Sequence, residues 1–248
     1  MSKKLVYLTP PEDSFEAAYL EVREKEERLY PDDIVKRLPI LPQDHPQAEE
    51  WALRHRNIEL LKAHLAQRQA QNVLDLGCGN GWLTHQQVGE NNSRKVLGLD
   101  INAAELEQAN RLFSSDQCTF AYGDVFQAEL APHSFDVITL VSCAQYFPSL
   151  PILLNRLQQL LQAEGEIHIL DTPFYDSAEL AAARKRTDDY YDQQGVSLMS
   201  NHYHHRSWAE LKGYRYEIKY NPRTLSSRIQ RKLGLKSSPF PWLIIYRA

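Results

Sequence analysis

Three alternating glycines after a short apolar run form the segment of this chain best suited to hold a small ligand. The segment reads Val73-Leu-Asp75-Leu-Gly77-Cys78-Gly79-Asn80-Gly81. Glycine has no Cβ, so a ligand can lie against such a turn, and a helix that follows presents unpaired N–H groups and a positive dipole end. Trp82 excludes the dinucleotide fingerprint G-x-G-x-x-G, and the absence of a following G-K-[ST] excludes a phosphate-binding loop. A plain turn does not need three glycines, so we expect a ligand here.

Two further carboxylates follow apolar runs of the same kind. Asp100 ends the run that starts at Val96, and its carboxylate could accept hydrogen bonds from both hydroxyls of a ribose. Asp124 follows Gly123 after a third run, where it could accept a hydrogen bond from an adenine amino group while the apolar Val125 covers the ring. For both aspartates the alternative is a simple capping role at the start of the next helix.

These residues lie together only if the apolar runs are parallel strands, because open α/β sheets bind ligands at the carboxyl ends of their strands. From Gln71 onward the sequence alternates apolar runs with helical patterns, which predicts a parallel sheet with helices on both faces. The expected strands are 73–76, 96–99, 119–122, 137–141, 166–170, 214–220 and 242–246.

Capping residues mark the helix boundaries within this alternation. Asn102 is expected to cap the helix after the second strand. Ser149 is expected to begin a helix that Gly165 ends. A capping box at Ser207 predicts a further helix that closes at Gly213.

Two segments lie outside the alternation. Residues 1–70 read as a helical N-terminal cover, and residues 71–248 as the main domain. Residues 176–205 are an insertion rich in tyrosine and histidine, which we expect to act as a lid. A metal site or plain surface is the alternative, although His202, His204 and His205 have no carboxylate or thiolate at regular spacing.

The glycine turn, Asp100 and Gly123–Asp124, in this order and spacing, resemble the class I S-adenosylmethionine-dependent methyltransferases over about residues 71–170, and more loosely over the last two strands. The resemblance implies an α/β, Rossmann-like, mostly parallel seven-stranded sheet with an antiparallel last strand, and S-adenosylmethionine as the cofactor. It is strongest to the small-molecule branch, including the quinone-biosynthesis type. It implies these cofactor contacts: methionine and ribose on Asp75, Gly77, Cys78, Gly79, Asn80 and Gly81, ribose hydroxyls on Asp100, and adenine on Asp124 between Ile101 and Val125.

Methyl transfer from a sulfonium is an in-line displacement, which depends on aligning the acceptor, the methyl group and the sulfur. A general base is needed only where the acceptor must lose a proton, so the sequence identifies no catalytic residue. We expect no metal requirement. Aromatic residues of the two covers suit a largely apolar small-molecule acceptor. Removing residues 1–45 is expected to spare much of the cofactor binding but to abolish transfer. The candidate acceptor contacts are Tyr19, Arg23, Tyr30, Trp51, Arg54, Gln145, Tyr146, Asp171, Phe174, Tyr175 and Tyr203.

Composition limits the alternatives. The chain has 248 residues, 43% of them apolar, and a net charge of −4, which is ordinary for a folded domain. No apolar run reaches the ~20 residues of a membrane helix, and three separated cysteines fit reduced thiols, so we expect a cytoplasmic protein. Eight basic residues against one acid between Lys212 and Lys236 leave RNA methylation open, although no RNA-binding module accompanies them. A non-catalytic cofactor-binding module is the other alternative, and nothing in the sequence specifies an oligomeric state.

Overall fold

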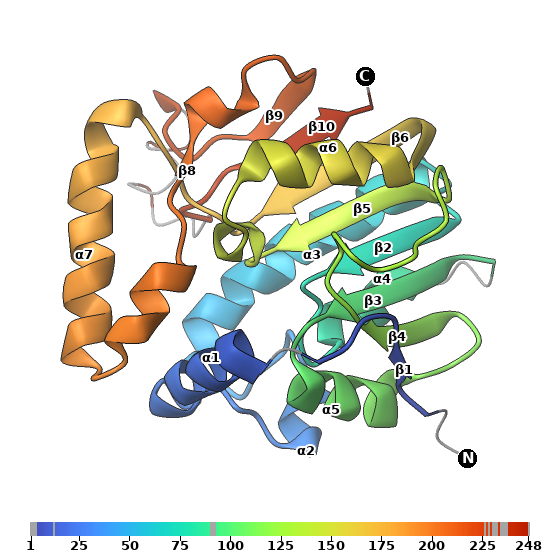
Figure 1. The fold of residues 1–248 in the computed structure, drawn as a ribbon, viewed down its shortest axis with the longest axis horizontal. Coiled ribbons are helices and arrows are strands. Elements are labelled where there is room, and N and C mark those ends of the chain that lie inside the picture. The colour runs from blue at the N-terminus through green and yellow to red at the C-terminus, as the bar shows by residue number, and fades with distance from the viewer. Residues whose placement is uncertain are drawn as a thin grey trace.

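The central sheet contains eight strands in the part of the chain that the computed structural model describes, namely residues 4–11, 13–89, 93–225, 227, 229, 233 and 238–247. The strands are β1 (Val6–Tyr7), β2 (Asn72–Leu76), β3 (Lys95–Asp100), β4 (Cys118–Tyr122), β5 (Phe135–Val141), β6 (Leu161–Leu170), β9 (Tyr216–Tyr220) and β10 (Trp242–Tyr246). Their order across the sheet is β1-β4-β3-β2-β5-β6-β10-β9 (Figure 1).

The direction of the strands confirms the expected Rossmann-like α/β architecture. All neighbouring pairs from β1 to β6 are parallel, whereas β10 runs antiparallel to both β6 and β9. The seven predicted strands are present, and β1 adds an eighth at the edge, where Val6 and Tyr7 pair with Ala121 and Tyr122. Two residues are too few for an alternating pattern to show in the sequence.

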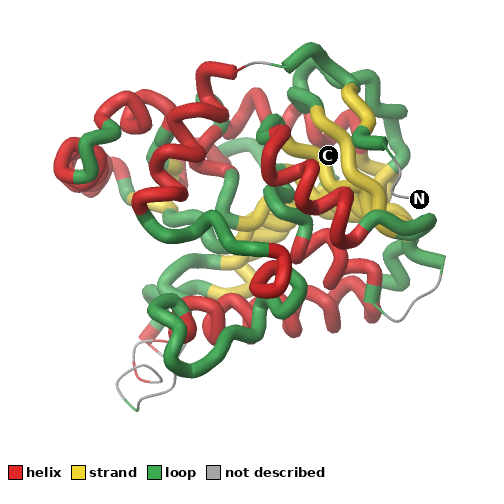
Figure 2. Tube along the Cα trace, turned by 90° about the horizontal axis from the view of Figure 1, so that it is seen from below, coloured by secondary structure: helices red, strands yellow, loops and turns green. Residues whose placement is uncertain are grey.

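Helices cover both faces of the sheet because alternate strand residues point to opposite sides. Leu74 of β2 packs in an apolar cluster with α6 (Leu150–Leu160), whereas Val73 packs in a second cluster with α3 (Ala48–Gln67) and α4 (Trp82–Val88). Leu106 of α5 (Ala103–Phe113) packs with Phe120 of β4. Figure 2 shows the strands as a twisted layer with helices on both sides.

The N-terminal segment and the insertion meet at one end of the sheet. Val22 of α1 (Asp13–Lys25) and Tyr191 of α7 (Leu180–Gln193) share a buried cluster with Val196 and Met199. In Figure 1, α1 and α7 lie at the end toward which the arrows of β2 and β5 point. The remaining short elements are α2 (Asp32–Val35), β7 (Phe174–Tyr175), β8 (Arg206–Ser207), η1 (Ala144–Tyr146), η2 (Ser177–Glu179), η3 (Ser197–His202) and η4 (Trp208–Leu211).

Two helix ends differ from the sequence predictions. α6 ends at Leu160 and β6 begins at Leu161, so Gly165 lies inside a strand and does not end the helix. Leu161 is fully buried in the core, which favours the early change to extended chain. The capping box at Ser207 forms, but the helix after it is a single 3₁₀ turn, because Lys212 is already extended.

The basic segment 212–236 is only partly described. Arg228, Arg231, Lys232 and Lys236 lie outside the described residues. Arg223 lies within them and donates to Asp176 and Glu179, at 3.1 and 2.9 Å, so its charge is already paired. Within the described ranges, no helix combines the length and apolar character that crossing a membrane requires.

Candidate active site

A cavity of about 1010 Å³ opens at the carboxyl ends of the parallel strands, where open α/β sheets bind ligands. Its volume lies at the upper end of the roughly 300–1,000 Å³ typical of small-molecule sites. It brings together most of the predicted site residues: Tyr19, Tyr30, Trp51, Gly77, Cys78, Gly79, Asn80, Asp100, Ile101, Asp124, Val125, Gln145, Tyr146 and Tyr203.

The glycine turn is required by packing as well as by access to the cavity. Gly77 and Gly81 have φ values of +73° and +74°, which side chains rarely adopt. A Cβ at Gly77 would lie 2.5 Å from Cβ of Cys143, and one at Gly81 would lie 2.6 Å from Cε1 of Phe120. Only glycine therefore fits these two positions.

Two of the predicted methionine and ribose contacts, Asp75 and Gly81, lie outside the lining of the cavity. Asp75 is 1% exposed beneath the turn, where it accepts hydrogen bonds from the hydroxyls of Thr84 and Thr139 at 2.7 and 2.9 Å. Burial raises the pKa of Asp75 to about 6 despite these bonds. Gly81 is the N-cap of α4. Asp75 thus links β2 to α4 and β5 through hydrogen bonds, and Gly81 joins the turn to α4.

Asp100 connects the end of β3 to the glycine turn. Its Oδ2 accepts a hydrogen bond from the N–H of Gly79 at 2.7 Å, and its Oδ1 accepts from Ile101 and Asn102 at 2.7 and 3.0 Å. The helix cap is Asn102, as predicted, because its side chain accepts from the N–H of Glu105. Asp100 is therefore not the cap, and Oδ2, which accepts only one of these bonds, can accept a further hydrogen bond from a ligand.

Asp124, the predicted adenine contact, also lines the cavity. Its two oxygens accept from the N–H of Phe126 at 3.0 Å and from Nε2 of Gln127 at 2.9 Å. The N–H of Asp124 donates to the hydroxyl of Thr9 at 3.1 Å. Thr9 also lines the cavity, and no sequence motif identifies it as a site residue.

Aromatic rings from three separate segments enclose the other part of the cavity. Tyr146 of η1 makes edge contacts with Phe15 and Tyr19 of α1 and with Tyr203 after η3, at centroid distances of 5.7, 5.6 and 6.1 Å. The N-terminal segment and the insertion therefore contact each other through these rings at this end of the cavity. Such a wall excludes water and suits an acceptor with apolar surface.

Other predicted acceptor contacts have their polar atoms satisfied within the protein. Trp51 donates from Nε1 to the hydroxyl of Tyr30 at 3.0 Å, and Tyr30 donates to Oε1 of Gln47 at 2.6 Å. Gln145 donates to the carbonyl of Ser142 at 2.7 Å. These side chains shape the wall of the cavity. Phe174 is buried in the core and does not line the cavity.

Asp171 presents an unusual carboxylate to the cavity. It follows β6 directly and has a positive φ of 51°, as does Ser142 after the neighbouring β5, with φ 58°. Its Oδ1 accepts from Nδ2 of Asn57 at 3.1 Å, whereas its buried Oδ2 has no hydrogen-bond partner among the described residues. Burial raises the pKa of Asp171, and the cation of Arg54 opposes this shift. Strained residues of this kind are typical of functional sites.

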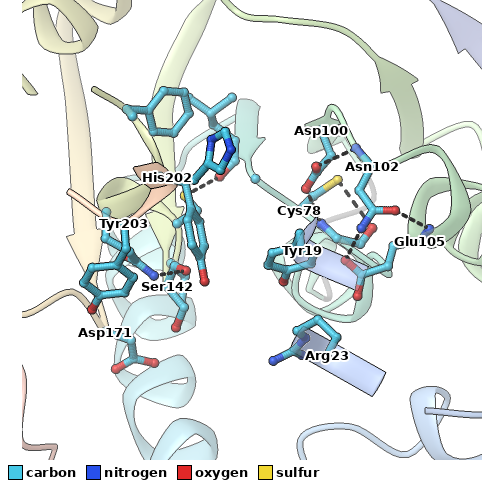
Figure 3. Close-up of a pocket in the computed structure, with 18 of the residues that line it drawn as sticks. Tyr19, Arg23, Cys78, Asp100, Asn102, Glu105, Ser142, Asp171, His202 and Tyr203 are labelled. Carbon is cyan, nitrogen blue, oxygen red and sulfur yellow. Dashed lines mark hydrogen bonds between the residues drawn. The ribbon is translucent and has the colours of Figure 1, made fainter. Parts of the chain in front are cut away.

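Glu105 of α5 lies in the cavity wall, although no sequence motif marks it as a site residue. Its Oε2 accepts from Nδ2 of Asn102 at 3.2 Å, and a Cβ at Gly79 would lie 3.2 Å from the same oxygen. Burial raises the pKa of Glu105 to about 7, and the nearby cation of Arg23 opposes the shift. Figure 3 shows Glu105, Cys78 and Asp100 on one side of the cavity, and Asp171 and Tyr203 on the other.

One cluster in the described chain has the residue types of a metal site. His64, Glu166 and His168 place ligand atoms within 4.8 Å of one another, away from the cavity. Nε1 of Trp242, which can only donate, bonds to Nδ1 of His168 at 3.1 Å. Nε2 of His168 therefore carries the ring proton and donates to Glu166 at 3.2 Å, which fits a hydrogen-bonded cluster better than metal ligation.

Comparison with known proteins identifies the family to which a chain of this architecture belongs. A family model described as a methyltransferase domain matches residues 67–219. The malonyl-[acyl-carrier protein] O-methyltransferase of Erwinia billingiae is 31% identical over 131 residues, which are 52% of this chain and 50% of the relative. The ubiquinone biosynthesis O-methyltransferase of Sodalis glossinidius is 30% identical over 100 residues, 39% of each chain.

The solved structure of an S-adenosylmethionine-dependent methyltransferase from Mesorhizobium loti shares the fold, with a TM-score of 0.54 and 20% identity over 77% of this chain and all of that one. The chain spans half or less of the length of the two curated relatives. Because the family model covers more than half of the chain, this protein belongs to the methyltransferase domain family.

Proposed function

We propose that this protein transfers a methyl group from S-adenosylmethionine to a small organic acceptor. The observation that carries the proposal is the convergence of three strand ends on one cavity. Gly77–Gly79 follow β2, Asp100 ends β3 and Asp124 follows β4, and all of them line the same 1010 Å³ space. The relatives named for O-methyl transfer support the same reaction class.

In the proposed complex the cofactor lies across the ends of these strands. Asp100 accepts hydrogen bonds from the ribose hydroxyls, and Asp124 accepts one from the adenine amino group. Ile101 and Val125 cover the two faces of the adenine. The methionine half extends along Gly77–Asn80, where the positive φ of Gly77 and Gly79 leaves backbone open to the cavity.

The displacement depends on the alignment of acceptor, methyl group and sulfur more than on catalytic groups of the protein. A lone pair of the acceptor attacks the methyl carbon, the carbon–sulfur bond breaks, and its electron pair stays on sulfur. The rings of Tyr19, Tyr146 and Tyr203 hold the acceptor and exclude water. Where the acceptor loses a proton, Asp171 is the base best placed to receive it, because its Oδ2 is unpartnered within the described chain.

The size of the acceptor follows from the walls of the site. α1 on one side and the insertion on the other meet through Val22 and Tyr191, so the aromatic part of the cavity is covered. A covered cavity suits a small molecule rather than a folded RNA. Arg223 of the basic segment pairs with Asp176 and Glu179, which lowers the charge available to a nucleic acid. The three cysteines are free and buried, consistent with work in the reducing cytoplasm.

Formation of S-adenosylhomocysteine tests the proposal. We would incubate the full chain with S-adenosylmethionine, with and without the low-molecular-mass fraction of a cell extract, and quantify S-adenosylhomocysteine by mass spectrometry. The proposal predicts product that depends on both protein and extract. Tight binding of S-adenosylmethionine with no product in any fraction would instead indicate a non-catalytic binding module.

A further inference from the structure

Arg54 of α3 is a cation of the cavity wall whose charge is only partly balanced. Its Nη2 lies 2.9 Å from Oε1 of Glu50, and its guanidinium carbon lies 5.1 Å from the ring centroid of Trp51. Glu50 is also the partner of Arg28, whose two Nη atoms donate to both of its oxygens at 2.9 and 2.5 Å. One carboxylate thus serves two cations, so Arg54 keeps positive charge and further N–H donors for a ligand.

Asp171 presents the opposite charge to the same cavity. Asn57, almost one turn after Arg54 on α3, donates to Oδ1 of Asp171 at 3.1 Å, whereas the buried Oδ2 has no hydrogen-bond partner among the described residues. Of the charges around Asp171, the cation of Arg54 lowers its pKa most, although no ion pair of the described chain joins the two side chains directly. A cation and an incompletely bonded carboxylate therefore line one cavity without satisfying each other.

A single hydroxyl group of a ligand satisfies both side chains. Its oxygen accepts a hydrogen bond from Arg54 and its proton is donated to Oδ2 of Asp171, so the ligand adds no charge to the site. A carboxylate in the same place would be repelled by Asp171 and Glu50, and an ammonium group would be repelled by Arg54 and Arg28. The arrangement therefore favours a neutral hydroxyl over either charged group.

The acidity of that hydroxyl follows from the base that it meets. A carboxylate is a weak base, even where burial raises its pKa as it does for Asp171. A phenol, with a pKa of about 10 as in tyrosine, or an enol can pass its proton to such a base when a cation stabilises the oxygen anion. A saturated alcohol is far less acidic. Figure 3 shows Tyr203 on the same side of the cavity as Asp171, where its ring suits the flat apolar body of such an acceptor.

We propose that Arg54 and Asp171 together bind the hydroxyl of a phenol or enol, and that this oxygen is the atom that becomes methylated. The inference rests on the proposed function and names its acceptor class. As the oxygen attacks the methyl carbon, its proton passes to Oδ2 of Asp171, the carbon–sulfur bond breaks, and the electron pair of that bond stays on sulfur. Arg54 stabilises the negative charge that develops on the oxygen. The products are a methyl ether, S-adenosylhomocysteine and a protonated Asp171, which returns its proton to water.

The attachment of the transferred methyl group tests the acceptor class. The full chain would be incubated with S-adenosylmethionine that carries carbon-13 in its methyl group and with the low-molecular-mass fraction of a cell extract. The chemical shift of the labelled carbon shows which element it is bound to, its long-range correlations show whether the next carbon is unsaturated, and stability in alkali separates an ether from an ester.

The inference predicts a methyl ether on an unsaturated carbon. A methylamine, a thioether, a C-methyl product, an ester or the ether of a saturated alcohol would overturn it. Absence of S-adenosylhomocysteine is a different result, because it would overturn the proposed function itself and the inference with it.

The role of Arg54 is tested by the pH dependence of the same reaction. Arg54→Gln should lower the initial rate at limiting extract about 100-fold, the order of loss when one donor to a developing oxyanion is removed. Because the cation lowers the pKa of Asp171, its removal raises that pKa, and the rising limb of the pH–rate profile should move to higher pH. Arg54→Lys keeps the charge and should return the limb toward its original position.

Arg56→Gln is the matched control, because Arg56 is an exposed cation of the same helix outside the lining of the cavity. It should change neither the rate nor the profile. Calorimetry should show that Arg54→Gln binds S-adenosylhomocysteine within about threefold of the unaltered chain. An unchanged rate in Arg54→Gln, a loss of rate with an unmoved limb, or an equal loss of S-adenosylhomocysteine binding would each overturn the role of Arg54.

Discussion

Oδ2 of Asp100 accepts a hydrogen bond from the backbone N–H of Gly79 at 2.7 Å, which ties the end of β3 to the turn after β2. The bond orients the carboxylate beside the backbone of the glycine turn, which lines the cavity. The position of a ligand along the turn and the position of its hydroxyl groups are thereby set together.

Replacing Asp100 with alanine should therefore weaken the binding of S-adenosylmethionine by about 1–3 kcal/mol, the usual cost of losing a charged hydrogen-bond partner. Titration calorimetry measures the change. Asp32→Ala is a suitable control, because Asp32 pairs with Arg111 on the surface away from the cavity. Unchanged affinity in Asp100→Ala would remove the basis for placing the ribose there.

Gly81→Ala should destabilise the fold rather than alter a ligand contact. The new Cβ would lie 2.6 Å from Cε1 of Phe120 at a φ of +74°, and overpacking together with the left-handed backbone costs about 2–5 kcal/mol. Urea unfolding measures this loss.

Gly213→Ala is the matched control, because Gly213 also has a positive φ, +94°, but has nothing within 4 Å of the added Cβ. This variant should lose only the unfolding free energy that a left-handed backbone costs alanine, about 1–2 kcal/mol. Equal losses in the two variants would show that packing against Phe120 does not contribute.

The buried cluster around Glu166 predicts a pH dependence of stability. Burial opposes ionisation of Glu166, but hydrogen bonds from His168 and His64 outweigh it and lower the pKa from 4.5 to about 2. Because the folded pKa lies below the unfolded one, the stabilisation is present above about pH 4.5 and is lost as the pH falls toward 2. Glu166→Gln should flatten the fall of the unfolding free energy across this window. Parallel curves for the two proteins would contradict the assignment.

Asp171→Asn should slow transfer to an acceptor that must lose a proton, while sparing cofactor affinity. A positioned base contributes roughly 10²- to 10⁴-fold, so kcat/KM should fall by about that factor. Asn57→Ala, which removes the hydrogen bond to Oδ1 but keeps the carboxylate, should have a smaller effect. Full activity of Asp171→Asn at all pH values would mean that no proton passes to this residue.

Much of the site could be predicted from the sequence because parallel strands end at a common edge. Asp100 and Asp124 line the same cavity for that reason, and the apolar runs before them are visible without a structure. Asp75 could not be placed, because a strand buried on both faces gives no sign of which residue faces the cavity. Its contact with Thr139 joins two strands that lie 64 residues apart.

Long-range contacts explain why the surroundings of other site residues could not be predicted. The carboxylate of Asp171 accepts a hydrogen bond from Asn57, which is 114 residues away in the sequence, and no local pattern indicates such a pair. The position of Arg23 in the cavity wall depends on how α1 lies over the cavity, which its helical spacing does not determine. β1 was missed because two residues carry no periodicity.

The most direct test of the central claim follows the methyl group itself. The full chain would be incubated with S-adenosylmethionine labelled on the methyl carbon and with an unfractionated cell extract, and the products would then be separated by molecular mass. The account predicts label in the small-molecule fraction, in amounts equal to the S-adenosylhomocysteine formed. Label confined to RNA or to protein would contradict it, because the covered aromatic cavity would then not be the acceptor site.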